Sequence, residues 1–70
     1  MSELIINGKE HQYDDGSMPQ TLALLLDELG IDQATVVAEV DGKIVERKMF
    51  STQELENGQK IELIRFVGGG

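Results

Sequence analysis

The chain has 70 residues, 13 acidic against 6 basic side chains, a formal net charge of −7 and no cysteine. This length allows one small domain with a modest core, and the lack of cysteine excludes disulfides, thiolate metal sites and a cysteine nucleophile. The acidic balance repels phosphate backbones, no apolar run could span a membrane, and Met1-Ser2-Glu3 lacks the basic start of a signal peptide. We therefore expect a cytoplasmic protein with no cofactor, no nucleic-acid partner and no membrane partner.

The first segment predicts a β-hairpin. The apolar run Leu4-Ile5-Ile6 ends in Asn7-Gly8, a pair that tolerates the positive φ angles of a type I′ turn. Residues 9–13 then form the return strand, and residues 14–17 form a turn or loop. The sequence places no serine, cysteine or lysine to be activated by His11, so we interpret this histidine as a solvated strand residue and the Asp14-Asp15 pair as part of the turn.

A leucine face provides the strongest helical signal. Four leucines recur at the spacing i, i+3, i+4, i+7, namely Leu22, Leu25, Leu26 and Leu29. Thr21 is the candidate N-cap, with an alternative start at Ser17. Gly30 can adopt the left-handed conformation that closes a helix, with Ile31 folding back onto it. Leu24 lies off the leucine face.

The second half predicts three further extended or irregular segments. Residues 35–40 are rich in β-branched side chains and predict a buried strand. A turn at Asp41-Gly42 leads to a short strand at 43–46. Residues 47–55 are ambiguous, and we interpret them as a helical turn or loop. Three apolar side chains of this segment are expected to fill the core: Met49, Phe50 and Leu55.

The last segment predicts a terminal strand. A turn at Asn57-Gly58 precedes it, it begins near Lys60, and residues 61–67 form its body. Strands at both ends and one helix between them predict an α+β domain over residues 1–67, with a mixed sheet of four to five strands and the main helix across one face. Residues 68–70 form a separate glycine tail.

The glycine tail is the candidate site for chemistry: Gly68, Gly69 and Gly70. Glycine lacks a Cβ, so such a tail can enter a narrow channel, and three extended residues reach about 10 Å. The carboxylate of Gly70 could then be adenylated by ATP and converted by a sulfur nucleophile to a thiocarboxylate. The alternative is a frayed terminus or cloning remnant without function.

The terminal strand also offers a docking surface. Side chains alternate along a strand, so Ile61 and Leu63 share one face, while three residues share the other: Glu62, Ile64 and Phe66. If the helix covers the first face, the apolar pair on the second lies exposed beside the tail and indicates a partner site. The alternative is that a loop covers this end of the strand.

The chain resembles the ThiS family of thiamine sulfur-carrier proteins over nearly its whole length. The likeness rests on seven segments: Asn7-Gly8, Thr21-Leu22, Leu25-Leu26, residues 37–45, Arg47, residues 57–63 and residues 66–70. The terminal di-glycine is the specific element, and the rest mainly defines the fold. Two turn positions depart from the family pattern, with Glu46 in place of a proline and Gln59 in place of an acidic residue.

This resemblance implies a β-grasp, ubiquitin-like fold and a carrier that is not itself an enzyme. It implies that a ThiF-like enzyme adenylates Gly70, that sulfur arrives by a cysteine-desulfurase route, and that a ThiG-like thiazole synthase receives it. Three alternatives stay open: the related small subunit of molybdopterin synthase or another sulfur carrier, a ubiquitin-like protein modifier, and an interaction domain with an inert tail.

Overall fold

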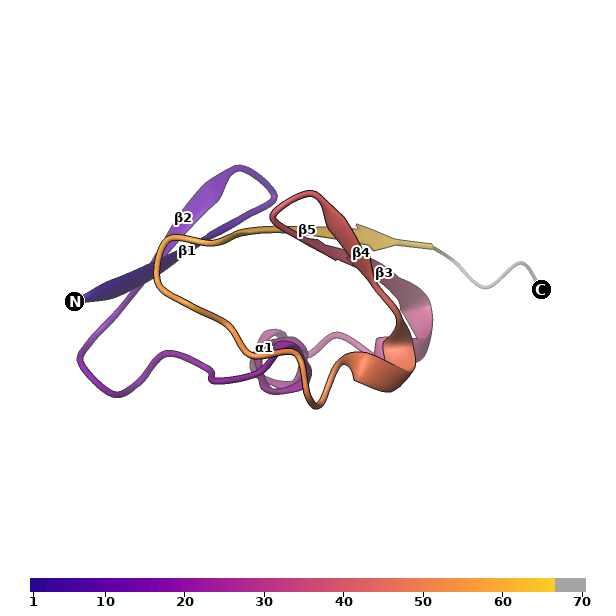
Figure 1. The fold of residues 1–70 in the computed structure, drawn as a ribbon, viewed down its shortest axis with the longest axis horizontal. Helices are drawn as coiled ribbons and strands as arrows, with labels where there is room; N and C mark the ends of the chain where they lie inside the picture. Colours follow the sequence, from indigo (N-terminus) through magenta and orange to yellow (C-terminus); the bar gives the residue numbers. More distant parts are fainter. Residues whose placement is uncertain (67–70) are drawn as a thin grey trace.

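The computed structural model describes residues 1–66, which form a five-stranded sheet and one α-helix. The elements in chain order are β1 (Ser2–Ile6), β2 (Lys9–Tyr13), α1 (Leu22–Leu29), β3 (Val36–Val40), β4 (Lys43–Val45) and β5 (Lys60–Arg65), with 3-10 helices η1 (Gln33–Thr35) and η2 (Arg47–Met49). The sheet order is β2-β1-β5-β3-β4. Figure 1 shows α1 lying across one face of this sheet. The predicted α+β arrangement is confirmed.

The first and last strands are neighbours, as the sequence predicts. β1 and β5 run parallel, while β1–β2, β3–β4 and β3–β5 are antiparallel. Two-residue turns join the hairpins, with φ of 51° at Asn7 and 79° at Gly8, and 51° at Asp41 and 82° at Gly42. Both central residues of a type I′ turn require positive φ, which explains why these positions carry Asn-Gly and Asp-Gly.

The helix begins and ends at the predicted residues. Thr21 is the N-cap, and its hydroxyl oxygen accepts a hydrogen bond from the Leu24 backbone N–H at 3.2 Å. Gly30 has φ of 72°, and the Ile31 N–H donates to the Leu26 carbonyl oxygen at 2.9 Å. This is the geometry of a glycine-closed helix end.

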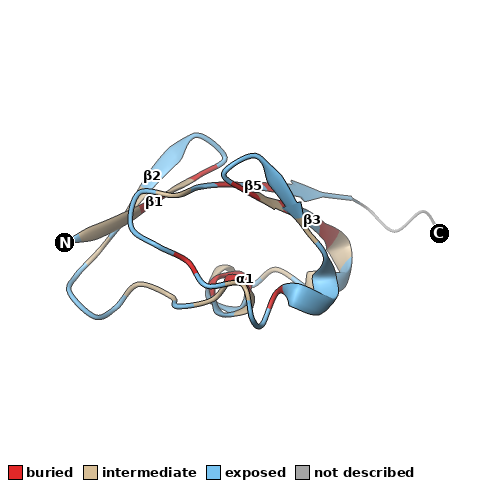
Figure 2. Cartoon of the chain, viewed as in Figure 1, coloured by how far each residue is buried: buried red, intermediate tan, exposed pale blue. Residues whose placement is uncertain are grey.

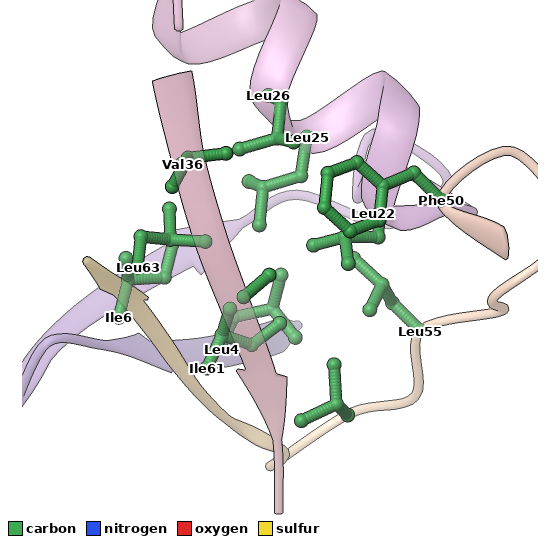
Figure 3. Close-up of a cluster of buried hydrophobic side chains, with 12 residues drawn as sticks. Leu4, Ile6, Leu22, Leu25, Leu26, Val36, Phe50, Leu55, Ile61 and Leu63 are labelled. Carbon is green, nitrogen blue, oxygen red and sulfur yellow. The ribbon is translucent and has the colours of Figure 1, made fainter. Parts of the chain in front are cut away.

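The core lies between α1 and the sheet and, within residues 1–66, contains 12 buried side chains (Figures 2 and 3). From the leucine face, Leu22, Leu25 and Leu26 are fully buried, and Leu29 is partly buried. Phe50 and Leu55 also fill the core. In Figure 3 the Phe50 ring lies beside Leu22, which joins the segment after η2 to the helix.

Four details differ from the sequence prediction. Met49 is 47% exposed, so its prediction as a core residue is wrong. Residues that follow one another in a 3-10 turn point in directions about a third of a turn apart, and here Phe50 faces the core while Met49 points outward. Thr35 belongs to η1, so β3 begins at Val36. β4 ends at Val45, because Glu46 already caps η2. β5 ends at Arg65. Val67 lies outside the described residues.

Within residues 1–66, no helix has the length and apolar character needed to cross a membrane.

Candidate functional site

The candidate site is built around β5, the middle strand of the sheet. β5 leads directly towards the glycine tail, and Gly68, Gly69 and Gly70 lie outside the described residues. The structure describes the chain up to Phe66, whose N–H donates to the Thr35 carbonyl oxygen at 3.0 Å. Pairing with the segment before β3 therefore continues one residue past the end of β5.

The predicted alternation along β5 is confirmed. Ile61 is fully buried and Leu63 is 6% exposed, because both face α1. Ile64 and Phe66 are 54% and 48% exposed on the opposite face. Exposure of this size shows that no loop within residues 1–66 covers Ile64 or Phe66.

Two neighbouring strands extend the apolar surface. Val37 of β3 pairs with Ile64, and Ile44 of β4 pairs with Glu39 on the same face. Val37 is 38% exposed and Ile44 is 70% exposed. We call Val37, Ile44, Ile64 and Phe66 the open-face patch. A hollow of ≈ 310 Å³ lies beside it, with Val37, Ile44 and Phe66 in its lining.

Sequence reasoning found only the β5 half of this patch. β3 contains the consecutive apolar residues Val36, Val37 and Ala38, so alternation gave no sign of which valine faces outward. Ile44 could have been found from the turn at Asp41-Gly42, because a tight hairpin fixes which residues of its two strands share a face.

Carboxylates accompany the apolar residues on this face. Glu62 of β5 pairs with Glu39 of β3, and Glu62 is exposed. Among residues 1–66 the ion pairs join the N-terminal amine to Asp15 and Lys48 to Glu46. Glu62 and Glu39 take part in neither pair, so their charges remain available to a basic partner surface.

The other titratable residues considered from the sequence form no reactive cluster. His11 lies half-buried on β2 opposite Leu4. Asp14 belongs to a turn in which its carbonyl oxygen accepts from Ser17. In the described part of the chain, no group of His, Asp and Glu side chains could hold a metal ion.

Tyr13 has a shifted pKa at the rim of the core. Burial raises the pKa of the phenol above its ordinary value of 10.0, and the Glu28 carboxylate adds to this by its charge and by a hydrogen bond. This contact joins β2 to α1 and lies on the helix side of the sheet, away from the open-face patch.

Comparison with known proteins assigns this geometry to a family. The sequence model of the ThiS family matches residues 4–70. The crystal structure of the thiamine biosynthesis protein ThiS from Geobacter metallireducens superimposes with a TM-score of 0.79 at 33% identity, over 97% of this chain and 99% of that one. An NMR structure of a thiamine biosynthesis protein from the same organism gives a TM-score of 0.77 at 33% identity, over 97% and 87% of the two chains.

A curated relative extends the comparison. A thiazole synthase from Paramagnetospirillum magneticum is 35% identical over 68 residues, which are 97% of this chain. The chain spans only 20% of the length of that relative. The sheet order, the single helix across one face and the match through residue 70 together show that the chain has the β-grasp fold and belongs to the ThiS family.

Proposed function

We propose that this protein is a sulfur carrier for the synthesis of the thiamine thiazole, with the carboxylate of Gly70 as its reactive group. The observation that carries the proposal is the family match, which includes the glycine tail because it runs from residue 4 to residue 70. The carrier acts as a co-substrate of other enzymes. We expect the reaction to occur in the cytoplasm, where ATP is available.

The chemistry at Gly70 proceeds in two steps. The carboxylate oxygen attacks the α-phosphorus of ATP, which forms the acyl adenylate and releases pyrophosphate. A hydrosulfide ion, released by a thiol from the persulfide of a cysteine-desulfurase route with formation of a disulfide, then attacks the acyl carbon and displaces AMP. The product is a thiocarboxylate, so a chain without cysteine carries its sulfur at its terminus. A ThiF-like adenylating enzyme would supply the site for both steps.

The proposed recipient is a ThiG-like thiazole synthase. Support comes from the thiazole synthase relative, in which the segment similar to this chain is only 20% of the polypeptide. In that thiazole synthase, a segment similar to this chain and a much longer region therefore belong to one polypeptide. Physical linkage of this kind raises the effective concentration of two modules that must meet.

We further propose that the open-face patch docks these enzymes. Ordering a glycine tail in a channel is entropically unfavourable, and burial of Ile64 and Phe66 would offset that cost at about 25 cal/mol per Å² of apolar surface. Both side chains are about half exposed in the free protein, and Glu62 lies beside them on the same face. Its charge would pair with a basic residue of the partner.

Intact-mass spectrometry tests the carrier proposal. After incubation with a ThiF-like enzyme, ATP and a sulfide source, the mass should rise by the difference between one sulfur and one oxygen atom, on a peptide that contains Gly70. No mass change with an enzyme that activates its own carrier would refute the proposal, as would sulfur on another residue. Attachment of Gly70 to a lysine of another protein would indicate a protein modifier instead.

The variant Gly69→Ala tests whether the tail enters a narrow channel. If the tail enters a channel that excludes a Cβ, this variant should lose most thiocarboxylate formation while its urea unfolding midpoint stays unchanged. Ser17→Ala in the exposed turn after β2 is the control for a small side-chain change away from the tail.

A further inference from the structure

The two edges of β5 are held by very different amounts of backbone pairing. β3 pairs with β5 along five residues, from Val36–Arg65 to Val40–Ile61. β1 pairs with it only at Ile5–Lys60 and Ile6–Ile61. The reason is that β1 turns into its hairpin at Asn7, while β5 continues towards the tail.

The side chain of Asn7 continues the β1–β5 ladder where the β1 backbone leaves it. The ladder advances in steps of two residues: the Ile5 N–H donates to the Gln59 carbonyl oxygen at 3.0 Å, and the Asn7 N–H donates to the Ile61 carbonyl oxygen at 2.9 Å. The next carbonyl oxygen along β5, that of Leu63, accepts from Asn7 Nδ2 at 3.2 Å. The Leu63 N–H donates to Asn7 Oδ1 at 2.7 Å.

This pairing requires an amide. A straight β1 would offer Leu63 a carbonyl oxygen and an N–H, and the carboxamide of Asn7 offers both. Asp41 occupies the same turn position of the β3–β4 hairpin, also with φ of 51°. Its carboxylate accepts from the Lys60 N–H at 3.0 Å and from Gln59 Nε2 at 3.3 Å. Asp41 therefore fixes the start of β5, whereas Asn7 fixes a point three residues closer to the tail.

We propose that Asn7 is a positioning residue for the reaction at Gly70. The assignment rests on the sulfur-carrier function proposed above. By holding both backbone groups of Leu63, Asn7 keeps the segment from Leu63 to Phe66 in the sheet and sets the direction in which the chain leaves it. A strand end held on one edge alone samples more directions, and fewer of them bring the carboxylate into line with the phosphate of ATP.

The test compares two glycine variants of equivalent turn positions. Asn7→Gly and Asp41→Gly each keep a residue that accepts positive φ and each remove a side chain that bonds to β5. Pyrophosphate exchange with a ThiF-like enzyme measures the adenylation step at saturating carrier. We expect Asn7→Gly to lower kcat about tenfold, with a smaller change in KM, and Asp41→Gly to stay within about twofold of the wild type.

Two further measurements separate positioning from general destabilisation. Amide hydrogen exchange should accelerate at Leu63 and Phe66 in Asn7→Gly, whereas in Asp41→Gly it should accelerate at Lys60. Asn7→Asp keeps the turn and the acceptor but loses the donor to the Leu63 carbonyl oxygen, so it should lower kcat in the same direction as Asn7→Gly.

The outcomes distinguish this proposal from the function on which it rests. Equal kcat values for the two glycine variants would overturn the role of Asn7 while leaving the carrier function intact, as would a change confined to KM. Absence of exchange with the wild-type protein would refute the carrier function, and the assignment of Asn7 would fall with it.

Discussion

The two faces of the sheet carry similar apolar side chains and differ in what covers them. Leu63 and Ile64 are neighbours on β5, yet Leu63 is 6% exposed against α1 and Ile64 is 54% exposed on the open face. Figure 2 shows buried residues on α1 and on the strands of the sheet. Apolar side chains therefore stabilise the fold on one face, whereas on the other face they remain exposed to water.

The open face is itself divided. On β2 it carries polar residues, Glu10 and Gln12, both exposed. On β3, β4 and β5 it carries the open-face patch. The face of an antiparallel hairpin that only contacts solvent is expected to be polar, as it is on β2. The exposed apolar residues Val37, Ile44, Ile64 and Phe66 lie on β3, β4 and the end of β5, whereas Ile5 of β1 faces the same side but is only partly exposed.

The covered face should respond most strongly to truncation. Leu25→Ala should lower the free energy of unfolding by about 2–5 kcal/mol, because Leu25 is fully buried and its removal leaves a cavity. Leu24→Ala is the control on the same helix, since Leu24 is 53% exposed, and its effect should stay within about 0.5 kcal/mol. Urea unfolding followed by circular dichroism measures both. Similar losses for the two variants would contradict the assignment of the helix faces.

On the open face, binding should change while stability does not. Ile64→Lys should weaken the affinity for a ThiF-like enzyme by about tenfold or more, because an apolar contact is lost and a charge must be desolvated. Gln12→Lys adds the same charge to the polar half of this face and should leave the affinity unchanged. Isothermal titration calorimetry measures the affinities. An Ile64→Lys protein that fails to fold would mean that Ile64 stabilises the fold, and the docking proposal would fail.

Charge on the open face should affect the rate of association more than charge elsewhere. Glu62→Gln and Asp27→Asn each remove one negative charge, the first beside the patch and the second on the exposed side of α1. Glu62→Gln should slow association severalfold at low ionic strength, and this difference should shrink at high salt. Asp27→Asn should have a smaller effect in stopped-flow measurements. Equal effects would indicate steering by net charge alone.

The smallest expected effect lies at the rim of the covered face, at Tyr13. Its pKa is raised in the folded state by burial and by Glu28, so the phenol holds its proton more tightly folded than unfolded. The resulting stability is fully present below pH 10 and is lost as the pH rises through the folded-state pKa. Urea unfolding at about pH 9 and about pH 11 should show a decrease that Tyr13→Phe reduces. The same pH response in the wild type and in Tyr13→Phe would contradict this contribution of Tyr13 to stability.

Local patterns predicted much of this molecule. The leucine spacing fixed the helix and its covered side, and the Asn-Gly and Asp-Gly pairs located the hairpins. The choice of Phe50 over Met49 for the core could not be predicted, because spacing does not reveal which of two adjacent apolar residues meets the sheet. The outward direction of Val37 was hidden by the apolar residues on both sides of it.

The role of Asn7 was hidden for a different reason. Turn chemistry fully accounts for an asparagine before a glycine, so the Asn-Gly pair does not indicate a second function for the asparagine side chain. Its partner, Leu63, lies 56 residues away in the chain. Such a contact becomes visible only when the parallel register of β1 and β5 is known.

The parallel arrangement of β1 and β5 has a mechanical consequence. When a chain is pulled at both ends, strands that lie side by side and parallel resist sliding, because the hydrogen bonds between them are loaded together instead of opening one after another. Here the bonds from Ile5 to Gln59 and from Asn7 to Ile61 lie across the direction of such a pull. Tension applied between the two ends of the described chain is therefore shared along the middle of the sheet.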